Sequence, residues 1–220
     1  MVVEPVIGAL ALLLLTQTPV WDAEPFKNPA PWKSVEKGAL SLDERPVKDS
    51  PFAEYRAIAT TASSIETLCL AVFEWGTKGA DSPGLKASRV LRDGDDERVV
   101  YQQIDQPVVS SRDYAMTVQR RRDPSGVCRI RFAATNELAP PKGPGVVRMD
   151  GLWGSWTFEP APGGKTQVTY TMYSNPSGSV PPFLVHGSLK SAVRDSLLKA
   201  LKKAQELEQL KAAPSPAPAR

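Results

Sequence analysis

The most regular hydrophobic pattern in the chain lies between residues 181 and 207. Leu189, Val193, Leu197 and Leu201 recur every four residues, alanines widen the stripe, and basic residues lie mostly off it. This spacing predicts an amphipathic helix with one apolar face and one basic face. At 1.5 Å per residue the helix would be roughly 40 Å long. Because strands are predicted before it, we expect its apolar face to pack across a sheet.

Alternating polar and apolar positions, separated by Gly, Pro and Asp turns, predict successive antiparallel hairpins before that helix. The expected strands span residues 39–47, 52–61, 85–92, 98–104, 112–121, 127–135, 146–160 and 166–174. A helix is expected over residues 64–75, ending at Gly76, and residues 32–37 suggest a short helix or turn. The predicted fold class is α+β, a helix-grip arrangement in which a curved antiparallel β-sheet wraps around a long C-terminal helix. Such a sheet can hold a cavity against the helix.

The two ends of the chain differ from this central pattern. Residues 6–15, VIGALALLLL, form a continuous apolar run that is short for a membrane span but suits a secretory signal. We therefore expect residues 1–23 to be a signal peptide or an N-terminal hydrophobic anchor, followed by a linker at 24–31. The folded domain would cover residues 32–210, and residues 211–220 a disordered tail. The expected location is exported, periplasmic or secreted, with anchoring through residues 6–15 as the second option.

Net charge and cysteine content bear on the possible partners and on disulfide bonding. The net charge of +3 gives no basic stripe of the kind that nucleic-acid-binding proteins carry, so no nucleic-acid partner is expected. The two cysteines, Cys69 and Cys128, make no disulfide framework. Both lie in apolar segments, and buried free thiols are the default expectation. A single bridge stays open if the compartment is oxidising.

A set of short motifs then carries a family resemblance. They are P-x-x-S-x-R-D at 107–113, V-R at 147–148, a proline turn at 160, K-T-x-V-T-Y at 165–170 and G-x-x-P at 178–181. In this order and spacing the sequence resembles the START (StAR-related lipid-transfer) domain family, most clearly over residues 99–204. The resemblance implies a helix-grip fold that binds one lipid, sterol or other hydrophobic molecule in an internal tunnel. It also implies a carrier, transfer or sensing protein rather than an enzyme.

The resemblance further implies a gate built from residues 105–111 and residues 181–201. Its clamp residues would be Pro107, Arg112 and Asp113. The sequence departs from sterol-transfer members at Val118, where some have an arginine inside the tunnel, and at His186, where the family often has Asn. A polar anchor for a sterol is therefore not expected at Val118.

Strand alternation suggests which side chains would line a cavity, because residues two apart share a face. The candidate set mixes Met, Tyr and Trp with few charges, which suits a ligand pocket, although ordinary core packing is the competing interpretation for each residue. The candidates are Tyr114, Met116, Val118, Phe132, Met149, Trp153, Tyr170, Met172, Phe183, His186 and Val193.

The neighbouring charges of Arg112 and Asp113 allow two interpretations. The first is an ion pair or loop clamp at the gate. The second is a buried Arg112 that binds a carboxylate or phosphate of the ligand.

Catalytic chemistry has little support in the sequence. There is no G-x-S-x-G motif, and the single His186 has no neighbouring nucleophile. One histidine and two scattered cysteines make no metal site, so neither metal nor cofactor is expected. The alternative is a helix-grip enzyme, cyclase- or hydratase-like, in which Tyr114, Tyr170, Asp113 or His186 would supply the acid and base. Two of these groups would then have to meet in one cavity.

The basic face of the final helix also allows two interpretations. The simpler is a solvated surface. The other is weak, transient contact with anionic lipid headgroups during ligand exchange.

Overall fold

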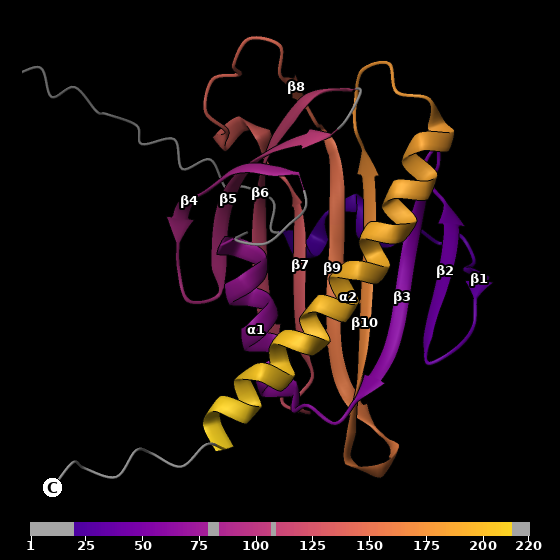
Figure 1. The fold of residues 1–220 in the computed structure, drawn as a ribbon, viewed down its shortest axis with the longest axis vertical. Coiled ribbons are helices and arrows are strands. Elements are labelled where there is room, and N and C mark those ends of the chain that lie inside the picture. Colours follow the sequence, from indigo (N-terminus) through magenta and orange to yellow (C-terminus); the bar gives the residue numbers. More distant parts are fainter. Residues whose placement is uncertain (1–19, 79–83, 107–108, 213–220) are drawn as a thin grey trace, which may run out of the picture.

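A computed structural model of the protein describes residues 20–78, 84–106 and 109–212. They form a curved sheet that is crossed diagonally by a long C-terminal helix, α2 (Pro182–Ala212). A second helix, α1 (Ile65–Lys78), lies on the same side of the sheet (Figure 1). The predicted α+β helix-grip arrangement is thus confirmed, and the core lies between the sheet and the two helices.

The sheet has ten strands within the described ranges, in the order β1-β2-β3-β10-β9-β7-β6-β5-β4, with β8 beside β6. The strands are β1 (Lys33–Glu36), β2 (Leu40–Pro46), β3 (Ala53–Thr61), β4 (Leu85–Asp93), β5 (Glu97–Gln106), β6 (Val109–Arg122), β7 (Cys128–Ala134), β8 (Val147–Arg148), β9 (Gly151–Ala161) and β10 (Lys165–Asn175). Short 3-10 helices span Val20–Asp22, Glu24–Lys27, Asn136–Leu138 and Pro162–Gly164. Neighbouring strands are antiparallel except for the short parallel pair of β6 and β8.

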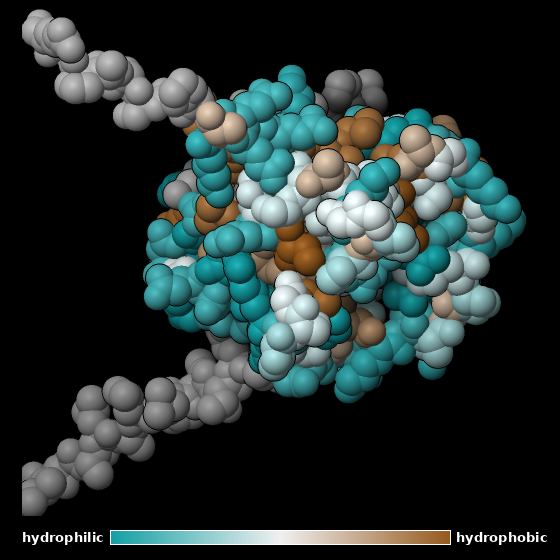
Figure 2. Space-filling model, turned by 90° about the horizontal axis from the view of Figure 1, so that it is seen from below, coloured by the Kyte–Doolittle hydropathy of each residue, from teal (hydrophilic) through white to brown (hydrophobic). Residues whose placement is uncertain are grey.

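Helix α2 buries the stripe that its sequence predicts. The buried residues recur at intervals of three and four and are Val185, Leu189, Val193, Leu197, Ala200 and Ala204. Seen from the end at which α2 finishes, the surface is mainly hydrophilic, with apolar side chains showing near the middle (Figure 2). The helix is therefore held on the sheet by one face only, as a helix with a single apolar stripe must be.

Helix α1 is fixed to the sheet by a covalent bond. Ser64 caps the helix, because its hydroxyl accepts a hydrogen bond from the backbone N–H of Thr67. Leu68 and Cys69 in the following turn are completely buried, and Cys69 forms a disulfide with Cys128 of β7, with 6.2 Å between the two Cα atoms. The default expectation of free thiols was wrong, since two cysteines 59 residues apart meet only when the helix packs on the sheet.

Several elements differ from the sequence predictions in type, length or number. Residues 33–36, expected as a helix or turn, form the edge strand β1, because they pair with β2. Helix α1 continues past Gly76 to Lys78. The expected strand over residues 146–160 is two strands, β8 and β9, since the strand is interrupted at Met149 and Asp150. That interruption changes which face the following residues occupy.

The segment before β1 packs on the sheet. Val20 is buried, and the ring of Trp21 lies under the guanidinium groups of Arg121 and Arg131, 4.6 and 4.8 Å from its centroid. Arg131 also donates a hydrogen bond to the carbonyl of Trp21 at 2.6 Å. The residues expected as a linker thus begin beside a packed contact. The apolar run at 6–15 and the tail at 213–220 lie outside the described residues.

Candidate functional site

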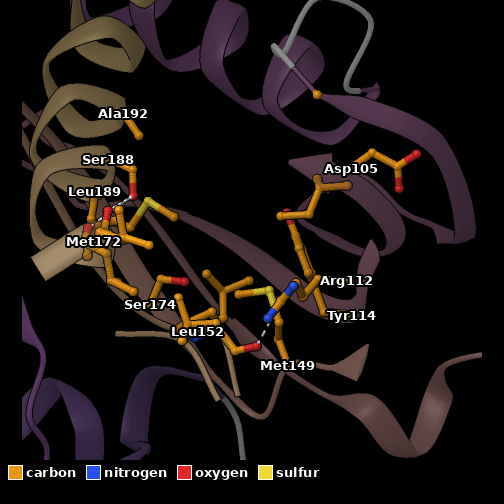
Figure 3. A pocket seen from close by; sticks show the side chains of 16 residues that line it. Asp105, Arg112, Tyr114, Met149, Leu152, Met172, Ser174, Ser188, Leu189 and Ala192 are labelled. Atoms are coloured by element: carbon orange, nitrogen blue, oxygen red, sulfur yellow. Dashed lines mark hydrogen bonds between the residues drawn. The ribbon is translucent and has the colours of Figure 1, made fainter. Parts of the chain in front are cut away.

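A pocket of about 530 Å³ opens between the sheet and the first half of α2 (Figure 3). Leu189, Ser188 and Ala192 of α2 lie with Met172 of β10 on one side, and Arg112 and Tyr114 of β6 lie across the space from them. The complete lining is Gly84, Ile104, Asp105, Arg112, Tyr114, Met149, Leu152, Met172, Ser174, Pro176, Val180, Leu184, Val185, Ser188, Leu189 and Ala192. The wall on the α2 side is mainly apolar.

On β9 the side chain that lines the pocket is Leu152, the residue before the predicted Trp153. Leu152 lines the pocket, and because successive strand residues point to opposite faces, Trp153 does not. Instead Trp153 stacks on Tyr173 of β10, with 3.7 Å between ring centroids. The prediction for Trp153 assumed one unbroken strand from residue 146, and the interruption at Met149 and Asp150 shifts the alternation.

Tyr114 places a phenol in the pocket wall. Its hydroxyl donates a hydrogen bond of 2.6 Å to the side-chain carbonyl of Gln102 on β5. Burial raises the pKa of Tyr114 to about 12, so the phenol is neutral at physiological pH. Tyr170, also buried with a raised pKa, donates to the sulfur of Met172 at 3.1 Å.

Arg112 and Asp113 do not pair with each other. The carboxylate of Asp113, which is fully buried, accepts hydrogen bonds from Nε and Nη2 of Arg148 at 2.7 and 3.0 Å and from Tyr101 at 3.1 Å. Arg112 points to the other face, lines the pocket and is 4% exposed. Its Nη1 donates to the carbonyl of Ser110, and its Nε lies 3.4 Å from the carbonyl of Pro176. The predicted ion pair between Arg112 and Asp113 is therefore wrong, because Asp113 pairs with Arg148 instead.

Asp105 lies at the edge of the pocket and is exposed. Its carboxylate pairs with Lys86 at 3.3 Å, and in Figure 3 it points away from Arg112. Hydrogen bonding from Ser111 and the charge of Lys86 lower the pKa of Asp105, so it stays ionised. Lys86 balances this acid.

The other predicted residues are placed as follows. Five are buried in the main core and do not line the pocket: Met116, Val118, Phe132, Tyr170 and Val193. Phe183 is 74% exposed, because it lies in the first turn of α2 ahead of the buried stripe. His186 does not line the pocket and lies within hydrogen-bonding distance of the Tyr55 hydroxyl and the Pro51 carbonyl. Pro107 lies outside the described residues.

Of the predicted set, Arg112, Tyr114, Met149 and Met172 thus come together in one pocket. The sequence interpretation missed most of the α2 wall, although the four-residue spacing of that helix already singled out Leu189. It also missed Ile104 and Ser174, since their inclusion depends on strand register and on how α2 crosses the sheet. Local alternation carries no information on either.

Within the described ranges no cluster of three or more His, Cys, Asp or Glu side chains is arranged to hold a metal ion. In the same ranges, no helix is long and apolar enough to cross a membrane.

The sequence matches a family model and a curated protein. The sequence model of the START domain matches residues 77–209. An uncharacterized protein of Pseudomonas aeruginosa is 26% identical over 163 residues, which cover 73% of this chain and 79% of that protein.

Solved structures with a similar fold include two lipid transfer proteins. The STAR-related lipid transfer protein of Xanthomonas axonopodis has a TM-score of 0.69 and 23% identity, over 79% of this chain and 98% of that one. Human StAR-related lipid transfer protein 5 has a TM-score of 0.65 and 18% identity, over 84% and 91%.

Proposed function

This chain belongs to the START domain family, and from that premise we propose that it carries one lipid or similar hydrophobic molecule in the pocket beside α2. The observation that carries the proposal is the pocket itself. Its volume of about 530 Å³ lies within the range of roughly 300–1,000 Å³ common for small-molecule sites. Leu152, Leu189 and Met172 supply apolar surface, and burying such surface favours a ligand by about 25 cal/mol per Å².

The proposed role is binding without catalysis. Of the four groups that an enzyme of this fold could use, only Tyr114 lines the pocket. Asp113 is held by Arg148, and His186 lies against Tyr55. The Xanthomonas axonopodis protein and the human protein described above are both named as lipid transfer proteins, which supports a carrier role.

We also propose that the protein is exported. Support comes from the apolar run at 6–15 and from the Cys69–Cys128 disulfide, because such bridges persist mainly in oxidising compartments.

The first turn of α2 is the proposed contact with a membrane during ligand exchange. Phe183 and Leu184 are 74% and 45% exposed there, and Leu184 also lines the pocket. A bilayer that receives these side chains would therefore lie next to the bound ligand.

Native mass spectrometry of the full-length purified protein tests the main proposal. We expect the protein to carry one lipid-sized molecule, or to take one up from mixed-lipid vesicles, and denaturation then releases that molecule for identification. A protein that stays ligand-free after incubation with vesicles would contradict the proposal.

Two matched substitutions locate the site. Ala192→Trp fills the pocket, whereas Ser191→Trp places the same side chain one position away on an exposed part of α2 outside the lining. We expect Ala192→Trp to weaken uptake by about tenfold or more, which corresponds to losing about two buried methylene groups. Ser191→Trp should bind as the natural sequence does. Equal uptake by both variants would mean that the ligand occupies another place.

A further inference from the structure

Arg112 is a buried cation in the pocket wall that has no carboxylate partner among the described residues. It is 4% exposed, and its hydrogen-bond acceptors are the uncharged carbonyls of Ser110 and Pro176. Among the described residues it forms no ion pair, and its Nη2 has no hydrogen-bond partner. Asp113, its sequence neighbour, is taken by Arg148 on the other face of the strand.

Among the described residues one further arginine is buried, and its contacts show how such a charge is compensated elsewhere in the structure. Arg98 is 7% exposed and has two carboxylate partners, Asp93 and Glu74, at 2.5 and 2.8 Å. It also donates to the carbonyl of Phe73. Arg98 lines no part of the pocket, whereas Arg112 does. The arginine that lacks an internal carboxylate is therefore the one that faces the pocket.

A guanidinium cannot lose its proton to escape burial, so its charge has to be compensated by dipoles or by an anion. Two carbonyl dipoles already orient Arg112. Arginine offers a planar set of donors that fits the two oxygens of a carboxylate or phosphate. Among the described residues that line the pocket, the one acidic side chain is Asp105, and it is paired with Lys86 at the edge.

We propose that Arg112 binds the anionic group of the ligand, so that the ligand class is an anionic amphiphile with a carboxylate or phosphate head. This inference rests on the proposed function and names its ligand class. The head lies at Arg112, and the hydrocarbon tail lies along the apolar wall that includes Met172 and Leu189, across the pocket in Figure 3. With an uncharged ligand the buried guanidinium has its two carbonyl acceptors but no anion, which costs affinity.

The experiment measures how well matched 18-carbon competitors displace the fluorescent methyl ester of cis-parinaric acid from the full-length protein. Oleate is compared with oleyl alcohol, and oleoyl lysophosphatidate with monoolein. The members of each pair share a chain and differ in the negative charge of the head. We expect the anionic member to bind about 10- to 100-fold more tightly, the range for hydrogen bonds to charged groups. Preference in the phosphate pair alone assigns a phosphate head, and preference for oleate assigns a carboxylate.

Two variants on one strand link the preference to Arg112. Arg112→Gln should bring the two members of each pair to within about twofold by weakening the anion, while the affinity of the neutral member is kept. Arg122→Gln makes the same change at the exposed far end of β6 and should keep the full preference. A preference that survives Arg112→Gln would overturn the inference.

A measurement on the natural sequence covers the case in which Arg112→Gln does not fold. The carboxyl carbon of [1-¹³C]oleate is followed by NMR while pH is varied. Beside Arg112 the pKa of the bound carboxyl should lie below that of oleate in phosphatidylcholine vesicles, because the cation favours the ionised form. A pKa above the vesicle value, or equal affinities within each pair, overturns the inference and leaves the proposed function standing. Failure of the probe and all four competitors to bind overturns the proposed function itself.

Discussion

The completely buried carboxylate of Asp113 is held at two points by Arg148, 35 residues later in the chain, at 2.7 and 3.0 Å. The pairing fixes the short strand β8 beside β6, and Arg148 also donates to the carbonyl of Pro140. It connects the pocket-forming strand to the loop that leads into β9. Because the carboxylate of Asp113 is paired with Arg148, it does not neutralise Arg112, which lines the pocket.

Removing one member of this pair should destabilise the fold strongly. We expect Asp113→Ala to lower the free energy of unfolding by about 3 to 5 kcal/mol, because the partly buried Arg148 and the buried hydroxyl of Tyr101 both lose their acceptor. Urea denaturation measures the loss. The exposed pair Arg92–Glu97 is the control, and Arg92→Ala should cost less than about 1 kcal/mol. Equal small losses at both sites would contradict the structural role of Asp113.

The disulfide should contribute measurably to stability. It closes a loop of 59 residues, for which chain entropy predicts about 4 kcal/mol and measured bridges typically give about 2 to 4. The double variant Cys69→Ala and Cys128→Ala should therefore unfold at a lower urea concentration. Reductant should shift the unfolding midpoint of the natural protein and leave that of the variant unchanged. A natural protein that is indifferent to reductant would argue against the bridge.

Gly154 is required by a close approach rather than by its backbone angles. A Cβ at this position would lie 2.3 Å from Cζ of Phe132 and 2.4 Å from the carbonyl oxygen of Thr171. We expect Gly154→Ala to cost about 1 to 3 kcal/mol through overpacking, seen as a lower Tm. Gly187→Ala on α2 is the control, since nothing lies within 4 Å of its added Cβ. That change should be neutral or stabilising by up to about 1 kcal/mol.

Tyr114 should make stability depend on pH in the alkaline range. Its pKa is raised by burial to about 12 in the folded protein, against about 10 in the unfolded chain. The folded state therefore keeps the phenolic proton up to a higher pH than the unfolded chain does. The stability that Tyr114 contributes to the fold is fully present below pH 10. It is lost as pH rises towards 12, by about 2 to 3 kcal/mol in total. Urea denaturation at a series of pH values should show a shallower decline for Tyr114→Phe. Parallel curves would mean that Tyr114 is not buried.

Trp21 should belong to the stable domain. Its ring is stacked under Arg121 and Arg131, and each such contact is worth about 0.5 to 1 kcal/mol at a surface site. Trp21→Ala should lower the free energy of unfolding by about 1 to 2 kcal/mol, whereas Lys27→Ala, at an exposed ion pair, should change it little. An unaffected Tm for Trp21→Ala would contradict this prediction. It would mean that the contacts of Trp21 do not stabilise the domain, so that removal of residues 1–23 would not cost stability through this ring.

Several features follow from the sequence because they depend on neighbouring residues. The four-residue spacing from Leu189 to Leu201 predicts the helix and its buried face, and turn residues such as Gly94 and Gly126 predict the hairpins. Alternation within β6 places Tyr114 on one face, and it does line the pocket. Together they determine the α+β arrangement, since a helix with one apolar face needs a sheet to cover it.

The tertiary structure alone decided which residues meet. The partner of Asp113 and the bond between Cys69 and Cys128 join segments far apart in the chain, about which local patterns are silent. The same holds for Trp153, whose face depends on the interruption between β8 and β9, and for Phe183, whose exposure depends on where α2 leaves the sheet. The periodicity of the sequence determines the secondary structure of each segment. Strand pairing and packing between distant segments determine which residues line the pocket, including Arg112.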